Sequence, residues 1–283
     1  MKSGRKWNCI LQSKWTFMVP SLTGTFVFAV LPFLEVLRRS LWDEKKNFFS
    51  VVNYANLWEN EAYRLAVKNT VKFVGVCIPL LLVLSLALAL GLFQSRWMKF
   101  LKSALLLPMA VPTAVVVFVW KLIFFKEGFL NMFLGLFSLK PVDWLGGEAA
   151  FFVLVISYIW KNMGYTMVLW LAAMAAIPKE MLEAAKVDGS NGIQSIHFMV
   201  LPSLKPAFYT ITIVSFLNSF KVFREAYLVA GSYPPKTMYL LQHLFNNWFI
   251  NLELGKISAG GVTMAVVFVF VTLLLQRMWD KPE

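Results

Sequence analysis

The chain is poor in the residues from which catalytic and metal sites are usually built. It has two cysteines, Cys9 and Cys77, and two histidines, His197 and His243, and the members of each pair lie in different segments. Cysteines placed in this way predict neither a disulfide nor a metal site. No Ser/His/Asp order and no pair of catalytic carboxylates can be assembled, so an enzyme is disfavoured, and we expect neither a metal nor a cofactor in this chain.

A nucleotide-binding domain is also missing. The sequence has no G-x-x-x-x-G-K-[ST] phosphate loop, and every stretch between its apolar runs is loop-sized. If this protein uses ATP, another polypeptide must bind the ATP and magnesium and hydrolyse the nucleotide. Acidic residues are scarce as well, at 15 against 27 lysines and arginines. The resulting charge of +12 does not indicate nucleic-acid binding, because the basic residues are scattered through loops without a contiguous basic domain.

Apolar side chains dominate instead. They make up 59% of the residues, and the mean hydropathy is +0.65, too high for a soluble domain of this size. Apolar runs of about 20 residues, enough to cross a bilayer, occur near 15–35, 70–93, 104–125, 150–173, 206–229 and 259–275. We therefore expect an all-α, polytopic membrane protein with about six transmembrane helices. An even number of spans places both termini on one side.

The basic residues predict which side that is. Lysines and arginines without acids precede the first apolar run, and Arg96, Lys99 and Lys102 fill the short second loop. By the positive-inside rule, residues 1–14 and 278–283 are cytoplasmic termini and 15–277 form the transmembrane domain. No small-x-small cleavage site closes the first run, which we interpret as an uncleaved span.

A short polar segment separates the fourth and fifth apolar runs. Pro178 suits a first helical turn, and Glu180 and Glu183 lie near the favourable positive end of a helix. Gly189 can supply a left-handed stop, so we predict a helix from Pro178 to Asp188. Such a helix is too short to be stable alone in water, which indicates that a partner holds it.

The same segment carries a family resemblance. Its spacing E-A-A-x-x-x-G, followed after nine residues by x-x-L-P, resembles the cytoplasmic loop of permease subunits of bacterial ABC importers. Met199 stands where that family usually has isoleucine, a conservative departure. The resemblance implies that 178–202 is a helical coupling segment that docks onto an ATPase. The matching residues are Glu183, Ala184, Ala185, Asp188, Gly189, Leu201 and Pro202.

Two further patterns resemble carbohydrate-type permeases. One precedes the second span, and its residues are Phe48, Asn53, Tyr54, Asn69 and Thr70. The other begins on the third span and extends just beyond it, and its residues are Pro108, Pro112, Trp120, Gly128 and Asn131. Each proline deletes a helix hydrogen bond, so the backbone must kink there. Without the neighbouring motifs, the first pattern is equally an ordinary surface loop and the second an ordinary kinked helix.

Polar residues form stripes on the two spans that flank the coupling segment. Their helical spacing places them on one face of each span, and polar groups inside spans mark a solute pathway or contacts between helices. The candidates are Tyr158, Lys161, Asn162 and Tyr165 on the fourth span, and Ser215, Asn218, Ser219 and Phe220 on the fifth. Aromatic faces with neutral hydrogen-bonding groups suit a sugar, and the resemblance also places solute contacts on these helices.

The charged residues of these spans leave alternatives open. Lys161 needs an acid, a carbonyl or water inside the membrane, and it either favours an anionic sugar derivative or pairs structurally. Lys221, Arg224 and Glu225 lie near the outer end of the fifth span, where long side chains can snorkel and pair. That position favours a gate or an interface over ligand contact.

The resemblance as a whole implies a transmembrane permease subunit of a carbohydrate-uptake ABC importer in a bacterial cell membrane. It also implies a second, similar permease, two copies of an ATPase and an extracellular solute-binding protein. The alternatives are a stand-alone channel or ion-coupled carrier, and a membrane scaffold. The segment YLVAGSYPPKT departs from the family's commoner Gly-Gly-Pro turn, so the sequence leaves the sugar, its length and its charge open.

Overall fold

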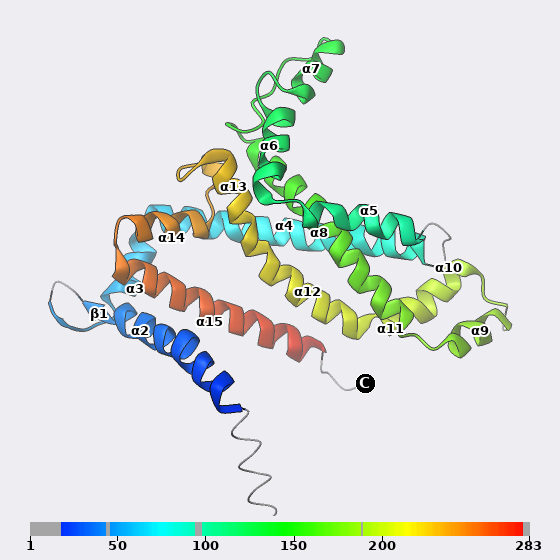
Figure 1. The fold of residues 1–283 in the computed structure, drawn as a ribbon, viewed down its shortest axis with the longest axis horizontal. Helices are drawn as coiled ribbons and strands as arrows, with labels where there is room; N and C mark the ends of the chain where they lie inside the picture. The colour runs from blue at the N-terminus through cyan, green and yellow to red at the C-terminus, as the bar shows by residue number, and fades with distance from the viewer. Residues whose placement is uncertain (1–17, 44–45, 94–97, 188, 280–283) are drawn as a thin grey trace, which may run out of the picture. The chain divides into compact units, whose positions relative to one another are not determined.

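The computed structural model describes residues 18–43, 46–93, 98–187 and 189–279, and nearly all of them are helical (Figure 1). The all-α class predicted from the sequence is confirmed. Strands β1 (Trp42–Asp43) and β2 (Phe48–Phe49), which the sequence did not predict, form a short antiparallel hairpin. The predicted N-terminal segment 1–14 lies outside the described residues, as do the last four residues of the chain.

Length and composition mark the helices that can cross a membrane. Four described helices qualify alone: Met18–Ser40, Glu61–Leu92, Ala150–Ala175 and Leu254–Met278. Two bent pairs raise the number to as many as six: Phe100–Ala110 with Thr113–Leu136, bent by 95°, and Gly192–Ser203 with Lys205–Ala230, bent by 65°. The predicted count of about six is reached when each bent pair forms one span.

One compact unit contains the described residues up to Asn60 together with 248–269. Its elements are the π-helical stretch η1 (Phe26–Val30), α2 (Leu31–Ser40), the hairpin, α3 (Val52–Glu59) and the first part of α15 (Leu254–Trp279). Asn53 donates its side-chain amide to the carbonyls of Trp42 and Ser40, at 2.9 and 3.2 Å, and the Tyr54 hydroxyl lies 2.9 Å from Ser40 Oγ. The Asn-Tyr pair therefore holds the chain where it leaves α2.

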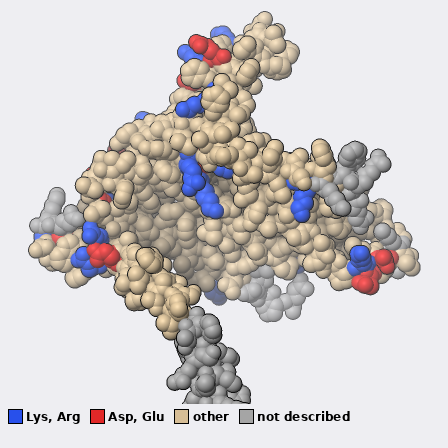
Figure 2. Space-filling view, viewed as in Figure 1, with Lys and Arg blue, Asp and Glu red and all other residues tan. Residues whose placement is uncertain are grey.

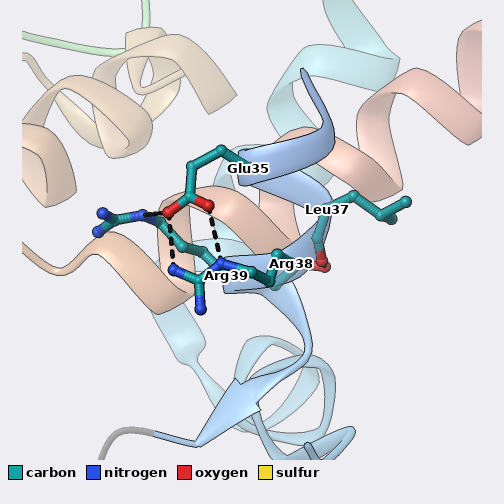
Figure 3. A network of polar contacts seen from close by, with 5 residues as sticks. Glu35, Leu37, Arg38 and Arg39 are labelled. Carbon is teal, nitrogen blue, oxygen red and sulfur yellow. Dashed lines mark hydrogen bonds and ion pairs between the residues drawn. The ribbon is translucent and has the colours of Figure 1, made fainter. Parts of the chain in front are cut away.

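Near the end of α2, one carboxylate binds two guanidinium groups (Figure 3). Arg38 and Arg39 each donate from Nε to Glu35 at 2.7 Å, from positions three and four residues further along the helix. Ion pairs as exposed as these contribute little stability. They neutralise one of the two cations at the end of the apolar helix and leave one net positive charge there.

The second unit contains the described residues of 61–247 and 270–283. Its centre is α8 (Ala150–Ala175), which packs against α4 (Glu61–Leu92), α5 (Met98–Ala110) and α12 (Lys205–Ser219). These four helices lie side by side in Figure 1. A buried cluster between α4 and α8 includes Phe73, Leu81, Leu154 and Tyr158, and it contains Cys77.

The third apolar run is broken rather than continuous. The sequence placed one span at 104–125, but α5 ends at Ala110, and α6 (Thr113–Phe124) begins after Pro112 in a new direction. Pro112 has no amide hydrogen to continue α5, and its fixed φ suits the start of a new helix. The predicted kink is therefore a sharp bend of 95° at Pro112, whereas Pro108 lies inside α5.

Polar motif residues fix the loops beyond the bend. Helix α7 (Phe129–Leu136) follows α6, and the buried Asn131 amide donates to the carbonyls of Lys126 and Val142, at 2.9 and 2.8 Å. Its side-chain oxygen accepts from the Val142 amide and the Trp144 indole. The Asn131 side chain thus satisfies backbone groups of a loop that has no helical hydrogen bonds of its own.

Two helices extend beyond the apolar runs that predicted them. Helix α4 starts at Glu61 rather than near residue 70, and α15 starts at Leu254 rather than near 259. Polar residues can continue a helix outside the bilayer because its backbone hydrogen bonds stay internal. Within α4, the Asn69 side-chain amide donates to the carbonyls of Lys236 and Tyr239.

The remaining elements of this unit connect the long helices. They are α9 (Lys179–Val187), α10 (Gly192–Ser195), η2 (Ile196–Val200), α11 (Leu201–Ser203), η3 (Phe220–Val222), α13 (Phe223–Ala230), η4 (Lys236–Met238) and α14 (Leu241–Ile250). The 3-10 turn η3 joins α12 to α13, and α13 packs against α6.

Candidate functional site

The coupling segment, residues 178–202, folds as a helix with a defined end. Helix α9 begins at Lys179, one residue after the predicted start, and it reaches at least Val187. The predicted last residue, Asp188, lies outside the described residues. Gly189 adopts φ +80°, and the Ser190 amide donates to the Ala185 carbonyl at 3.0 Å. Together these form a Schellman stop, in which glycine avoids the cost of a left-handed backbone. The left-handed glycine predicted from the sequence is present.

A second cap starts the next helix at once. The Asn191 side chain accepts from the Gln194 amide at 2.8 Å, and the Gln194 side chain accepts from the Asn191 amide at 2.9 Å. This capping box begins α10, from which the chain continues through η2 into α11. Leu201 and Pro202 lie in α11, just before the 65° bend that leads into α12.

Apolar side chains project from this otherwise polar segment. Val187, Ile193 and Phe198 are 87%, 80% and 71% exposed, while Ala185 is buried. Glu183 and Ala184 are exposed on α9. A hollow of about 430 Å³ lies beside them, lined by Ala185, Gly189, Ser190, Gln194, Ser195, Phe198 and Met199. Exposed apolar groups rimmed by polar ones are typical of a docking surface.

The coupling segment connects directly to two long helices. It follows the last residue of α8 and precedes the first residue of α12, and it lies at the opposite end of these helices from α13 (Figure 1). A displacement of α9 and α10 therefore reaches both helices through short connections.

A cavity of about 420 Å³, lined by polar, charged and aromatic side chains, lies between α8 and the chain from the end of α12 into α13. The structure brings five of the predicted pathway residues to its wall: Tyr158, Lys161, Asn162, Asn218 and Phe220. It adds residues that the sequence stripes missed, including Thr113 and Ser157. Ser157 is next to the predicted stripe, and Thr113 starts α6, where the bend after Pro112 turns the chain toward α13.

The other predicted pathway residues do not line the cavity. Ser219 is buried and donates to the Phe216 carbonyl at 2.6 Å, and the Ser215 carbonyl accepts from the Tyr158 hydroxyl at 2.9 Å. Tyr165 is half-buried away from the cavity wall. The contact from Tyr158 to α12 is therefore made with the backbone of Ser215 and does not involve its hydroxyl group.

Lys161 forms an ion pair with Glu225. Its ammonium group donates to the Glu225 carboxylate and lies 3.4 Å from Thr113 Oγ1, so it links α8, α13 and α6. The Glu225 side chain is only 8% exposed. The sequence placed Glu225 near the outer end of the span, where it could snorkel, but the structure places it in the cavity wall. A partner 64 residues away cannot be identified from helical spacing.

Two more cations face the same space. Lys221 and Arg224 line the cavity, and the Lys221 ammonium donates to Asn218 Oδ1 at 2.7 Å. Figure 2 shows basic side chains on the surface where α12 meets α13, without acidic surface next to them. Among the described residues, no group of three His, Cys, Asp or Glu side chains is placed to hold a metal ion.

Comparisons with known proteins give this geometry a context. Residues 74–281 match the family described as the binding-protein-dependent transport system inner membrane component. The chain is 29% identical to the trehalose/maltose transport system permease of Thermococcus litoralis, over 91% of this chain and 89% of that one. It is 26% identical to a probable starch degradation products permease of Thermoanaerobacterium thermosulfurigenes, over 95% and 94% of the two chains.

Two further relatives complete the comparison. An sn-glycerol-3-phosphate permease of Agrobacterium fabrum is 28% identical over 94% of both chains. Among solved structures, a bacterial ABC transporter involved in the import of the acidic polysaccharide alginate shares the fold. Its TM-score is 0.86 at 20% identity, and the match covers 98% of this chain and 99% of the other.

Proposed function

Because the chain belongs to the family of binding-protein-dependent transport system inner membrane components, we propose that it is one of two permease subunits of an ATP-driven sugar importer. It forms half of the translocation pathway for a sugar or oligosaccharide. The printed names of several relatives, which include maltose, starch-product and arabinooligosaccharide permeases, support the sugar class.

The other components follow from this role. A second, similar permease completes the pathway, two copies of an ATPase bind ATP and magnesium, and an extracellular binding protein delivers the solute. The chain lies in the bacterial cell membrane with both termini and the coupling segment on the cytoplasmic side. The basic residues of the second loop support this orientation.

The observation that carries the proposal is the connection of an exposed, doubly capped segment to the two helices at a polar cavity. When ATP closes the ATPase pair, the coupling segment moves with it and rocks α8 and α12, so that the cavity opens to the outside instead of the cytoplasm. Glu183 contacts the ATPase groove, Gly189 permits the tight turn, and Leu201 with Pro202 sets the angle at which the chain re-enters the membrane.

Gly189 offers the sharpest test, because a Cβ added there meets no atom within 4 Å. The substitution Gly189→Ala therefore changes the backbone preference without a clash, and holding alanine at a left-handed φ costs about 1–2 kcal/mol. In the reconstituted complex, we expect ATP hydrolysis stimulated by solute-loaded binding protein to fall about fivefold or more. Gly189→Asn is the matched control, since asparagine tolerates this conformation and should retain most of the coupling.

The possible outcomes separate the candidate functions. If Gly189→Ala does not reduce the ATP hydrolysis stimulated by solute-loaded binding protein, the turn at Gly189 does not take part in coupling. Solute movement by the purified chain alone, without ATPase or ATP, rejects the importer and favours the stand-alone channel or ion-coupled carrier.

A further inference from the structure

We propose that the cavity between α8 and α13 selects a sugar that carries a negative charge, a carboxylate or a phosphate, and holds that charge with Lys221 and Arg224. This inference rests on the proposed import function and names the substrate class of the same cavity. It is carried by the balance of charges on the cavity wall and by the partners that those charges have.

The wall carries three cations, Lys161, Lys221 and Arg224, and a single acid, Glu225, among the described residues. Glu225 is committed to Lys161, whose ammonium group it contacts directly. The pair is mostly shielded from solvent, so its two charges cancel within the wall. The net positive charge of the cavity therefore belongs to Lys221 and Arg224.

Neither of these two cations is neutralised within the part of the chain that the structure describes. Lys221 donates to an amide oxygen, Asn218 Oδ1, which carries no net charge. Arg224 makes no ion pair with a described residue. Both follow closely after α12, on the stretch that runs from Phe220 to Glu225 along the cavity. Both side chains are exposed to solvent, so an anionic group of a solute can reach them from the cavity.

The remaining wall suits the neutral part of such a solute. Tyr158, Phe220 and Phe223 provide aromatic surface, and Asn162, Ser157 and Thr113 provide neutral polar groups. A neutral sugar would satisfy these groups and leave both cations without a counter-charge. A sugar acid or sugar phosphate satisfies them and also accepts charge-assisted hydrogen bonds from the guanidinium and ammonium groups.

The test compares matched solutes on the assembled complex in nanodiscs of phosphatidylcholine. The probes are neutral glucose disaccharides and trisaccharides and the same compounds with one terminal glucose replaced by glucuronic acid. We expect at least one acidic probe to bind on the order of tenfold more tightly than its neutral counterpart, since one hydrogen bond to a charged group contributes about that factor. We expect this preference to fall as salt is raised.

Three variants locate the effect. Lys221→Gln and Arg224→Gln should each reduce the preference for the acidic probe, measured as the ratio of its affinity to that of the neutral probe, on the order of tenfold. Lys140→Gln removes one positive charge from an exposed loop position outside the cavity and should change neither. Glu225→Gln should have the opposite effect and tighten binding of the acidic probe, because it frees Lys161 as a third donor.

The outcomes distinguish failure of the anionic-solute inference from failure of the proposed import function. If the complex takes up the neutral probe with ATP, but binds no acidic probe more tightly than its neutral counterpart, the importer stands and the anionic solute is overturned. The same holds if Lys221→Gln and Arg224→Gln leave a preference for the acidic probe unchanged. The inference also fails if no acidic probe binds. It fails as well if acidic probes bind in phosphatidylcholine nanodiscs but not in nanodiscs that contain phosphatidylglycerol, because the cations then hold a lipid headgroup. Failure of ATP-driven uptake for every probe, with selective binding of the acidic one intact, overturns the proposed function instead.

Discussion

At the scale of single residues, the ion pair between Lys161 and Glu225 has the clearest energetic consequence. The two side chains are 22% and 8% exposed, so removing one partner leaves a poorly hydrated charge without compensation. We expect Lys161→Met to destabilise the purified protein by about 3 kcal/mol, measured as a lower midpoint of thermal unfolding in detergent.

The double variant Lys161→Met/Glu225→Gln is the control for this prediction. It removes both charges, and we expect it to recover most of the lost stability because no buried charge is left unpaired. If the losses of the two single variants simply add in the double variant, the two charges are not coupled and the pair has no role in holding α8 against α13.

A second prediction at this scale concerns pH. His243 is fully buried, its Nδ1 accepts from the Leu240 amide at 3.2 Å, and its Nε2 has no hydrogen-bond partner among the described residues. Burial lowers the pKa of the imidazole from 6.5 to about 4. The unfolded chain therefore binds a proton more readily than the folded protein, and stability decreases as the pH falls from about 6.5 toward about 4.

The expected loss across this window is on the order of 3 kcal/mol. Thermal unfolding midpoints between pH 7.5 and pH 4.5 should show it, and His243→Gln should flatten the slope even if it lowers the midpoint at every pH. His197 is exposed, so His197→Gln serves as the control and should leave the slope unchanged. An equally steep slope in His243→Gln would assign the acid sensitivity to other groups.

At the scale of helices, the contact between α5 and α8 depends on one missing side chain. A Cβ added at Gly164 would run into the backbone carbonyl of Leu105, which cannot move as a flexible side chain would. We expect Gly164→Ala to force the two helices apart at a cost of about 1–3 kcal/mol, seen as a lower unfolding midpoint.

Gly75→Ala in α4 is the matched control, because an added Cβ there meets no atom within 4 Å. It exchanges the same residues inside a long helix, where alanine is intrinsically favoured by about 1 kcal/mol. The midpoint of Gly75→Ala should therefore stay level or rise. If both variants behave alike, Gly164 is not required for the close approach of α5.

The helices also show what could be predicted from the sequence and why. Apolar runs, the proline pair and Gly189 act through local backbone chemistry, so they predicted the helical class, the kink and the stop after α9. Helix ends outside the bilayer, such as Glu61, were missed because an apolar run shows only which part of a helix lies in the bilayer. It does not show where the helix itself begins or ends. The pairing of Lys161 with Glu225 depends on how α8 and α13 pack, and helical spacing reports only the residues that share a face within one helix.

At the scale of the whole molecule, the coupling segment and the cavity belong to the same compact unit, residues 61–247 with 270–283. Helices α8 and α12 belong to it as well and carry the path between them. Import in the proposed direction requires the coupling segment to face the cytoplasm. It also requires the loop between α7 and α8 to face outward, because α8 separates the two as one span.

Cysteine labelling tests this orientation. In a Cys9→Ser background, the remaining Cys77 is fully buried and should not react. Ile193 in the coupling segment is 80% exposed, and Lys140 lies exposed before α8. We expect a membrane-impermeant maleimide to label Lys140→Cys in right-side-out vesicles and Ile193→Cys only in inside-out vesicles.

The Ile193→Cys variant also tests whether the ATPase docks on the coupling segment. Purified partner ATPase, added to inside-out vesicles, should reduce labelling of Ile193→Cys, because the exposed apolar side chains of the coupling segment become covered. Glu61→Cys, exposed at the start of α4, is the control for vesicle orientation. We expect it to be labelled in right-side-out vesicles and to stay unlabelled in inside-out vesicles, with or without the ATPase. Labelling of Ile193→Cys in right-side-out vesicles would place the coupling segment outside the cell, where no cytoplasmic ATPase can reach it, and the import mechanism would fail.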